Sequence, residues 1–295
     1  MPGEDQSLAD LRRQIDDIDA RIHDLLMQRA QMARNIGALK PADSMQMRPG
    51  REATVLRRLI ARHEGDLPKA LIVRVWREIF SALTTLQGAF AVAVFAPEGT
   101  FGFRSLARDH FGWRTPITAY RSAAQVLEAV SDGRATVGVL PMPRSDEAQP
   151  WWRHLARNGE AVPRIVARLP FAVVEPAGSD SAEALAISLR AAEETGKDRA
   201  FLMVETDEVV SRGHLKDLLE GAGLTVVDVQ VTEDAGRRTL HLVEVEGFVP
   251  EDDGRLDGLR RQGDGTVIQV RAVGGFAVPL SWDEMNADGA GPPDP

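Results

Sequence analysis

Apolar residues with helical spacing run through the first ninety residues of the chain. Between residues 7 and 40 they recur mostly at steps of three and four, and no Gly or Pro interrupts them before Gly37. Ser7 and Asp10 form an N-terminal capping pattern, and Pro41 ends the run. The pattern predicts a helix of about 34 residues, roughly 50 Å long. Because a small monomeric domain cannot bury so long an apolar stripe, we expect an intertwined dimer.

Two shorter helical patterns follow a turn-rich loop at residues 41–50. Apolar spacing of three and four resumes after residue 51 and again between residues 71 and 86, and Gly88 closes the segment. Residues 7–88 are therefore expected to form a bundle of one long, one short and one medium helix.

Beyond residue 90 the apolar runs become short and alternate with helical patterns. This alternation predicts a central α/β region over residues 91–197, divided by a polar loop at residues 143–150. The expected strands are residues 91–96, 135–141 and 164–175, and the expected helices are residues 122–133, 151–159 and 181–196.

The C-terminal part has a different order of elements. Over residues 199–280 the order strand, helix, strand, strand, helix, strand predicts a ferredoxin-like domain. Residues 281–295 form a tail that is expected to be disordered at its end. The predicted fold class is therefore multidomain, α plus α/β, with an N-terminal three-helix bundle, a central α/β region and a C-terminal ferredoxin-like domain.

The composition fits a folded protein without cysteine chemistry. Hydrophobic residues make up 43% of the 295 residues, so each region can bury a core. The absence of Cys excludes disulfides, thiolate metal sites and Cys nucleophiles, and fits a reducing compartment. The start is acidic and lacks an apolar signal region, and no run approaches eighteen apolar residues. We therefore expect a cytoplasmic protein with no membrane partner.

Charge is unevenly distributed along the chain, whose net charge is −9. Residues 1–90 contain 14 Lys or Arg and 12 Asp or Glu, whereas the remaining residues contain 21 and 32. An acidic protein binds nucleic acid poorly, so no nucleic-acid partner is expected. The mildly basic segment suits either a small anionic ligand or an ordinary solvated helix surface.

Two cations of the basic segment can face one site. Arg29 and Lys40 are eleven residues apart, so a regular helix places them within about 20° of the same face. Arg12 lies about 100° round the helix from Arg29 and some 25 Å along it, so Arg12 can join that site only from another chain. Further candidates near the helix ends are Arg51, Glu52 and Gln87.

These candidates coincide with a family pattern. The segments at residues 8–40, RE at 51–52 and WREIFSALTTLQ at 76–87 resemble the all-helical chorismate mutases. The I-D-x-I-D pattern at 15–19 and L-L-x-x-R at 25–29 are the most specific parts of the resemblance. It implies a homodimeric enzyme of aromatic amino-acid biosynthesis that rearranges chorismate to prephenate without a cofactor or a metal.

The resemblance also implies how the substrate is held. Arg29, and Arg12 of the partner subunit, bind the two carboxylates of chorismate, and Arg51 assists on the same dianion. The reaction is a concerted (3,3) rearrangement, so the enzyme must hold a compact, chair-like conformer. Bidentate guanidinium groups are suited to clamping both carboxylates for that purpose.

The remaining family positions act on the breaking bond. The resemblance implies that Lys40 and Gln87 hydrogen-bond the ether oxygen, where charge develops, and that Glu52 receives the ring hydroxyl. Donors aimed at that oxygen stabilise the transition state more than the ground state. Two positions depart from the family pattern, because Arg48 replaces a common acidic residue and Leu83 replaces a Ser-like residue.

The central region resembles the dehydratase part of the bifunctional chorismate mutase–prephenate dehydratases. APEGTFG at residues 96–102 is similar to the start of that domain. Residues 126–145 and 196–204 are similar to the stretches that carry its V-P-I-E-N-S and T-R-F motifs. Residues 92–197 are too few for both dehydratase lobes, so the resemblance implies a degenerate region.

The departures in this region affect the residues that carry the chemistry. Pro143 and Arg144 stand where the family has Glu-Asn, and Asp198 stands where it has a catalytic Thr. Dehydration needs a positioned acid to protonate the leaving hydroxyl, so dehydratase activity is expected to be absent. The motif residues that survive, as a vestigial set, are Thr100, Ser145 and Arg199.

Residues 199–280 resemble ACT domains, the amino-acid sensors of the same family. Gly213, His214 and Leu215 lie where such domains carry a G-A-L ligand motif, but the accompanying E-S-R-P segment is absent. We therefore expect an ACT-like dimerisation module rather than a phenylalanine sensor.

Two other functions remain open. The first is a bifunctional mutase–dehydratase in which Thr100, Ser145 and Arg199 serve the second reaction. The second is a non-catalytic sensor of aromatic metabolites, or a regulatory partner, that uses the helical bundle for dimerisation. Assays of chorismate turnover and of phenylpyruvate formation from prephenate distinguish these two hypotheses from a chorismate mutase without dehydratase activity.

Overall fold

The computed structural model describes residues 7–39, 47–99, 102–144, 147, 150–157, 159, 161–173, 182–207, 210–233, 238–262 and 266–286. Its N-terminal helices are α1 (Leu8–Leu39), α2 (Pro49–Ala61) and α3 (Lys69–Thr85), which confirms the predicted long, short and medium helices.

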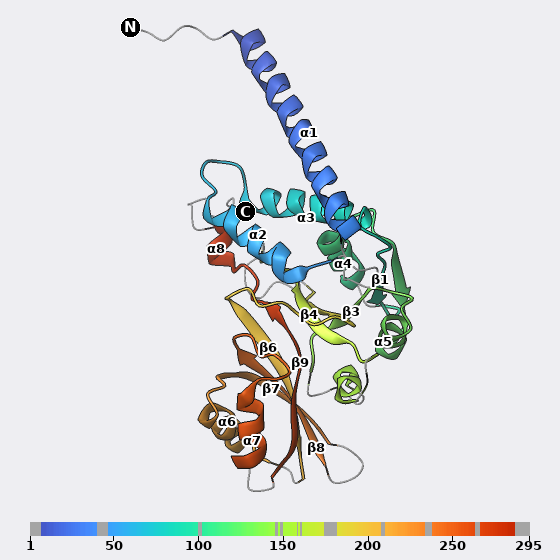
Figure 1. Cartoon of the computed structure of the whole chain (residues 1–295), viewed down its shortest axis with the longest axis vertical. Helices are drawn as coiled ribbons and strands as arrows, with labels where there is room; N and C mark the ends of the chain where they lie inside the picture. Colours follow the sequence, from blue (N-terminus) through green and yellow to red (C-terminus); the bar gives the residue numbers. More distant parts are fainter. Residues whose placement is uncertain are drawn as a thin grey trace, which may run out of the picture.

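Helix α1 projects away from the rest of the chain, with only its C-terminal end near α3 (Figure 1). Ala33 is the buried residue of α1. Ile15, Ile18 and Ile22 remain 57%, 51% and 50% exposed. Over most of its length the apolar stripe therefore has no partner among the residues that the structure describes.

The strands in the described part of the chain form one mixed sheet. They are β1 (Val92–Phe95), β2 (Ile117–Tyr120), β3 (Val137–Pro141), β4 (Arg164–Leu169), β5 (Ala184–Ser188), β6 (Asp198–Thr206), β7 (Val226–Glu233), β8 (Thr239–Glu246) and β9 (Val267–Ala277). Their order is β2-β1-β3-β5-β4-β9-β6-β8-β7. β1 is parallel to β2 and β3, whereas β5 is antiparallel to β3 and β4.

The central and C-terminal strands join where β4 meets β9, at Ile165 and Gly274. Gly274 has a φ of +121°, and a Cβ atom there would collide with the backbone of Ile165. Glycine is therefore required at this junction, because it alone lacks that atom and adopts this φ freely. The sheet consequently continues from one predicted region into the next.

The C-terminal part has the βαββαβ order that the sequence predicts. It runs β6, α6 (Arg212–Gly221), β7, β8, α7 (Gly254–Gln262) and β9, with a sheet order of β9-β6-β8-β7. Helices α6 and α7 lie against one face of these strands in Figure 1. Leu215 and Leu256 from the helices pack with Leu202 and Val243 from the strands in a shared apolar cluster.

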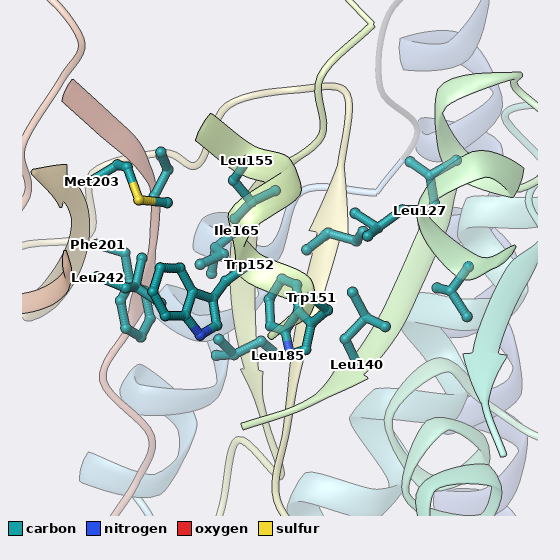
Figure 2. Packing of buried hydrophobic residues seen from close by; sticks show 14 of the residues in the cluster. Leu127, Leu140, Trp151, Trp152, Leu155, Ile165, Leu185, Phe201, Met203 and Leu242 are labelled. Atoms are coloured by element: carbon teal, nitrogen blue, oxygen red, sulfur yellow. The ribbon is translucent and has the colours of Figure 1, made fainter. Parts of the chain in front are cut away.

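A second apolar cluster fills the opposite face of these strands and extends under the central ones. Figure 2 shows Trp152 of the 3₁₀ helix η1 (Trp151–Ala156) beside Phe201 and Leu242, with Trp151 beside Leu140. Trp152 is fully buried. The two tryptophans therefore serve as core residues that connect the central strands to the C-terminal ones.

Several predicted elements differ from the structure. Residues 181–196 were expected to be helical, but Ala184–Ser188 is the fully buried strand β5. Its Ala and Leu favour helices in isolation, whereas pairing with β3 and β4 on both sides determines its conformation. The helices of the central region differ from prediction in smaller ways. The expected helix at 151–159 is the six-residue 3₁₀ helix η1. The expected helix at 122–133 is confirmed as α5 (Ala123–Ser131). Helix α4 (Phe103–Phe111) is not predicted by the apolar pattern. Helix α8 (Trp282–Asn286) occupies the start of the predicted tail.

The helical bundle packs directly on the α/β region. Leu56 of α2 and Phe80 of α3 share one apolar cluster with Phe171 and Leu280. The Arg57 guanidinium donates hydrogen bonds to Thr195 Oγ1 at 2.8 Å and to the carbonyls of residues 197 and 278, each at 2.7 Å. The bundle is thus anchored by both apolar and polar contacts. Within the described residues, no helix has the length and apolar character needed to cross a membrane.

Candidate active site

A cavity of about 520 Å³ lies where the C-terminal half of α1 meets α2 and α3. Of the six mutase-site residues that the family resemblance implies, four line it together: Arg29, Arg51, Glu52 and Gln87. Other side chains that line the cavity are Arg48, Arg58, Phe80 and Leu83. Segments that are separate in sequence therefore bring four of the six predicted site residues to one cavity.

The cavity is rich in positive charge. Arg29, Arg48, Arg51 and Arg58 line it, and Glu52 is the acidic residue among the lining side chains that the structure describes. A small ligand with two carboxylates would offset that charge, and guanidinium groups bind carboxylates in a bidentate way. The electrostatics of the cavity thus favour a dianion.

Arg29 is positioned by an aromatic side chain of α3. Its guanidinium carbon lies 5.5 Å from the centre of the Phe80 ring, in a cation–π contact. Burial lowers the pKa of Arg29 from its ordinary value, and the nearby Glu52 opposes that effect. The side chain is only part-buried, so it holds its charge while facing the cavity.

Glu52 is held by a buried ion pair. Its Oε2 atom accepts a hydrogen bond from Nη1 of Arg77 at 2.8 Å, and the two side chains are 13% and 6% exposed. Burial raises the pKa of Glu52, while the positive charges of Arg77 and Arg29 act in the opposite direction. Glu52 is consequently a polar group that is fixed in place at the wall of the cavity.

Arg77 also belongs to this site, although it is not among the residues that the family pattern indicates. Its spacing carries a usable signal, because it lies on the buried face of α3 with Val73 and Phe80, at steps of four and three. A charged residue within an apolar helical stripe requires a buried partner. Arg77 is such a residue, and Glu52 is its partner.

The two departures from the family pattern both reach this cavity. Arg48 precedes α2, and its Nε lies 2.7 Å from Oε1 of Glu193 in the α/β region. Leu83 presents an apolar side chain where the family has a Ser-like one. The amide nitrogen of Gln87 donates to the carbonyl oxygen of Leu83 at 3.3 Å, which holds Gln87 at the end of α3.

Other predicted residues are placed elsewhere. Arg12 is exposed near the far end of α1 and does not line the cavity of its own chain. Lys40, Thr100 and Ser145 lie outside the described residues. Arg199 pairs with Glu244, with Nη1 and Oε1 2.8 Å apart.

Asp198, at the position of the dehydratase Thr, has a structural environment. Its carboxylate accepts hydrogen bonds from the backbone N–H groups of Thr195 and Gly196, at 2.7 and 3.0 Å. It also accepts one from the Thr195 hydroxyl at 2.5 Å. Asp198 therefore closes the turn that Arg57 contacts. In the part of the chain that is described, no three acidic or His side chains group as metal ligands would.

Comparisons with known proteins agree with the location of this cavity. Residues 11–88 match the family model of chorismate mutase type II, so this stretch carries a chorismate mutase domain. A bifunctional chorismate mutase/prephenate dehydratase of Stutzerimonas stutzeri is 33% identical over 150 residues, which are 49% of this chain and 41% of that relative. The chain thus matches less than half the length of this curated relative.

Solved structures with related folds are more distant. The quorum-quenching acylase GqqA matches 63% of this chain and 94% of its own, with a TM-score of 0.48 and 20% identity. A prephenate dehydratase from Streptococcus mutans matches 65% of this chain and 100% of its own, with a TM-score of 0.45 and 13% identity. Neither likeness is strong enough to indicate a function for this chain.

Proposed function

We propose that this chain is a chorismate mutase that rearranges chorismate to prephenate in the cavity between α1, α2 and α3. The observation that carries the proposal is that Arg29, Arg51, Glu52 and Gln87 line one cation-rich cavity within the mutase domain. The residues act by binding and electrostatics, so the chemistry needs no covalent intermediate.

The mechanism follows from the charges of substrate and transition state. Arg29 and Arg51 bind the substrate dianion and favour the compact conformer in which the reacting carbons meet. Gln87 offers its amide to the ether oxygen as the carbon–oxygen bond breaks, and Lys40 supplies positive charge there. Glu52 accepts a hydrogen bond from the ring hydroxyl of the substrate. These interactions strengthen as charge develops, which lowers the barrier.

The active enzyme is proposed to be a homodimer, because one chain supplies an incomplete site. Arg12 belongs to the set of substrate-binding residues but lies near the far end of α1 from the cavity. An antiparallel copy of α1 would cover the exposed stripe that includes Ile15, Ile18 and Ile22. The same arrangement would bring Arg12 of the partner subunit to the cavity.

The test is depletion of chorismate by purified full-length protein, followed by its ultraviolet absorbance. Arg29→Gln should reduce kcat/KM at least about 100-fold, because it removes a charge-assisted contact to the dianion. Arg62→Gln, at an exposed position directly after α2, is the matched control and should retain turnover. No turnover by the wild type, or equal turnover in Arg29→Gln, would contradict the proposal.

We further propose that the α/β region lacks dehydratase activity. Asp198 bonds to its own turn and Arg199 pairs with Glu244, so neither side chain is free to serve a second substrate. The expected result is no phenylpyruvate from prephenate, even at high enzyme concentration. Phenylpyruvate formation at a rate proportional to enzyme would instead support the bifunctional reading.

A further inference from the structure

A second cavity, of about 450 Å³, lies between α3, α4 and residues 170–173. It is outside the mutase cavity and combines residues of the helical bundle with residues of the α/β region. Its size is within the range of sites for small molecules. Most of its wall is apolar, and the apolar side chains are Ala70, Val73, Leu106, Pro170, Phe171, Ala172, Val173 and Ala182.

Positive charge enters this cavity from α3. Arg77 and Arg74 both line it, and the Arg77 guanidinium carbon lies 5.4 Å from the centre of the Phe171 ring. Arg77 is 5% exposed, whereas Arg74 is exposed at the surface. Among the described lining residues, Asp109 is the acidic one. An apolar wall with two guanidinium groups favours a ligand that has an apolar body and an anionic end.

His110 adds a polar ring to the wall of this cavity. It lines the cavity and is 7% exposed, and its ring nitrogens form no hydrogen bond with any residue that the structure describes. The ring nitrogens are not among the fully buried polar atoms that lack a partner, so they remain accessible to a ligand in the cavity that His110 lines. Burial, reinforced by the charge of Arg77, holds the pKa of His110 well below its ordinary value. The neutral ring therefore offers one donor and one acceptor.

The two cavities share a wall. Glu52 lines the mutase cavity, Arg77 lines the second cavity, and their ion pair at 2.8 Å joins the two. A negative charge placed beside Arg77 would offset part of the positive charge that stabilises ionised Glu52. Binding in one cavity would in this way change the electrostatics of the other, and the coupling must be reciprocal.

We propose that the second cavity binds a small carboxylate with an apolar body, oriented by Arg74, Arg77 and His110, and that this ligand lowers mutase turnover through the Arg77–Glu52 pair. The evidence for the binding site is the cavity itself. The effect on turnover rests on the proposed mutase function.

Calorimetric titration of the full-length protein with 3-phenylpropanoate tests the binding site. We expect saturable binding of one molecule per chain. The matched probe 3-phenylpropanamide has the same body without the charge and should bind at least about tenfold more weakly. Equal affinity for the two probes, or no binding of 3-phenylpropanoate, would overturn the proposal.

Two variants locate the binding site. His110→Phe preserves a buried ring and Arg74→Gln changes an exposed side chain, so both should fold, which thermal unfolding checks. Each should weaken 3-phenylpropanoate binding about tenfold. Arg29→Gln alters the mutase cavity and should leave the affinity for this probe unchanged. Loss of binding in Arg29→Gln, with retention in His110→Phe, would place the probe in the mutase cavity and overturn the assignment.

Turnover tests the coupling. In the wild type, 3-phenylpropanoate should lower kcat for chorismate at saturating substrate, and in His110→Phe this inhibition should largely disappear. Binding that leaves kcat unchanged, or inhibition that excess chorismate removes, would overturn the coupling. If the protein proves to have no mutase activity, the calorimetric result still decides whether the second cavity is a carboxylate site.

Discussion

Nη1 of Arg77 lies 2.8 Å from Oε2 of Glu52, and both side chains are almost completely buried. Arg77 also lies over the ring of Phe171, a residue beyond the stretch that matches the mutase family. The pair therefore connects the wall of the mutase cavity to the α/β region. The proposed mutase site is therefore supported from outside its three helices.

Breaking this pair should destabilise the protein strongly. Arg77→Met leaves Glu52 buried without its partner, and we expect the free energy of unfolding to fall by about 3–5 kcal/mol. Urea denaturation measures the change. In the double variant Arg77→Met with Glu52→Leu, no buried charge is left alone, so the loss should be smaller than in Arg77→Met. A double variant that is less stable than Arg77→Met would contradict this account.

The exposed stripe of α1 should determine the oligomeric state. Ile18→Glu places a charge at the centre of the proposed interface and should yield a monomer without chorismate turnover, as measured by light scattering and by the turnover assay. Ala20→Glu is the matched control, because two residues further on it faces the opposite side of the helix. A dimeric Ile18→Glu variant, or equal dissociation of the two variants, would contradict the proposed interface.

Acidification should destabilise the fold through His241. Burial lowers its pKa to about 4, so the unfolded chain binds a proton more readily than the folded chain. Stability is therefore full above the ordinary His value of about 6.5 and is lost as pH falls toward 4. Between pH 7 and pH 5 this site should cost about 2 kcal/mol.

The variant His241→Phe isolates this contribution from other acidic effects. Nε2 of His241 is 3.2 Å from Oγ1 of Thr206, and losing that contact costs the same at both pH values. Relative to the wild type, the variant should therefore gain about 2 kcal/mol in unfolding free energy when the pH is lowered from 7 to 5. Parallel pH profiles for the two proteins would exclude His241 as the titrating group.

Much of the fold could be predicted from the sequence, because the spacing of apolar residues reflects the period of the local helix or strand. The three N-terminal helices follow their apolar spacing, and the βαββαβ order of the C-terminal part follows its alternating runs. Strand β5 was mistaken for a helix, since its short Ala- and Leu-rich run is compatible with both conformations. Its conformation depends on pairing with β3 and β4, which no local pattern contains.

The candidate site was predictable in part for the same reason. Arg29, Arg51, Glu52 and Gln87 could be identified because the family pattern lies within one continuous segment. The contacts of Arg48 with Glu193 and of Arg57 with Thr195 span 145 and 138 residues, so spacing could not indicate them. Arg77 was missed although its place in the apolar stripe of α3 was visible, because its partner lies on another helix.

The most direct test of the central claim is complementation between two inactive variants. Arg12→Ala and Arg29→Ala should each lose most turnover as homodimers, while light scattering shows that both still dimerise. If each site combines Arg29 of one chain with Arg12 of the partner subunit, half of the dimers in an equimolar exchanged mixture are mixed, and each has one intact site. The mixture should then recover about a quarter of wild-type turnover. A mixture that stays as inactive as its parents, with subunit exchange verified by mass spectrometry, would contradict the shared active site.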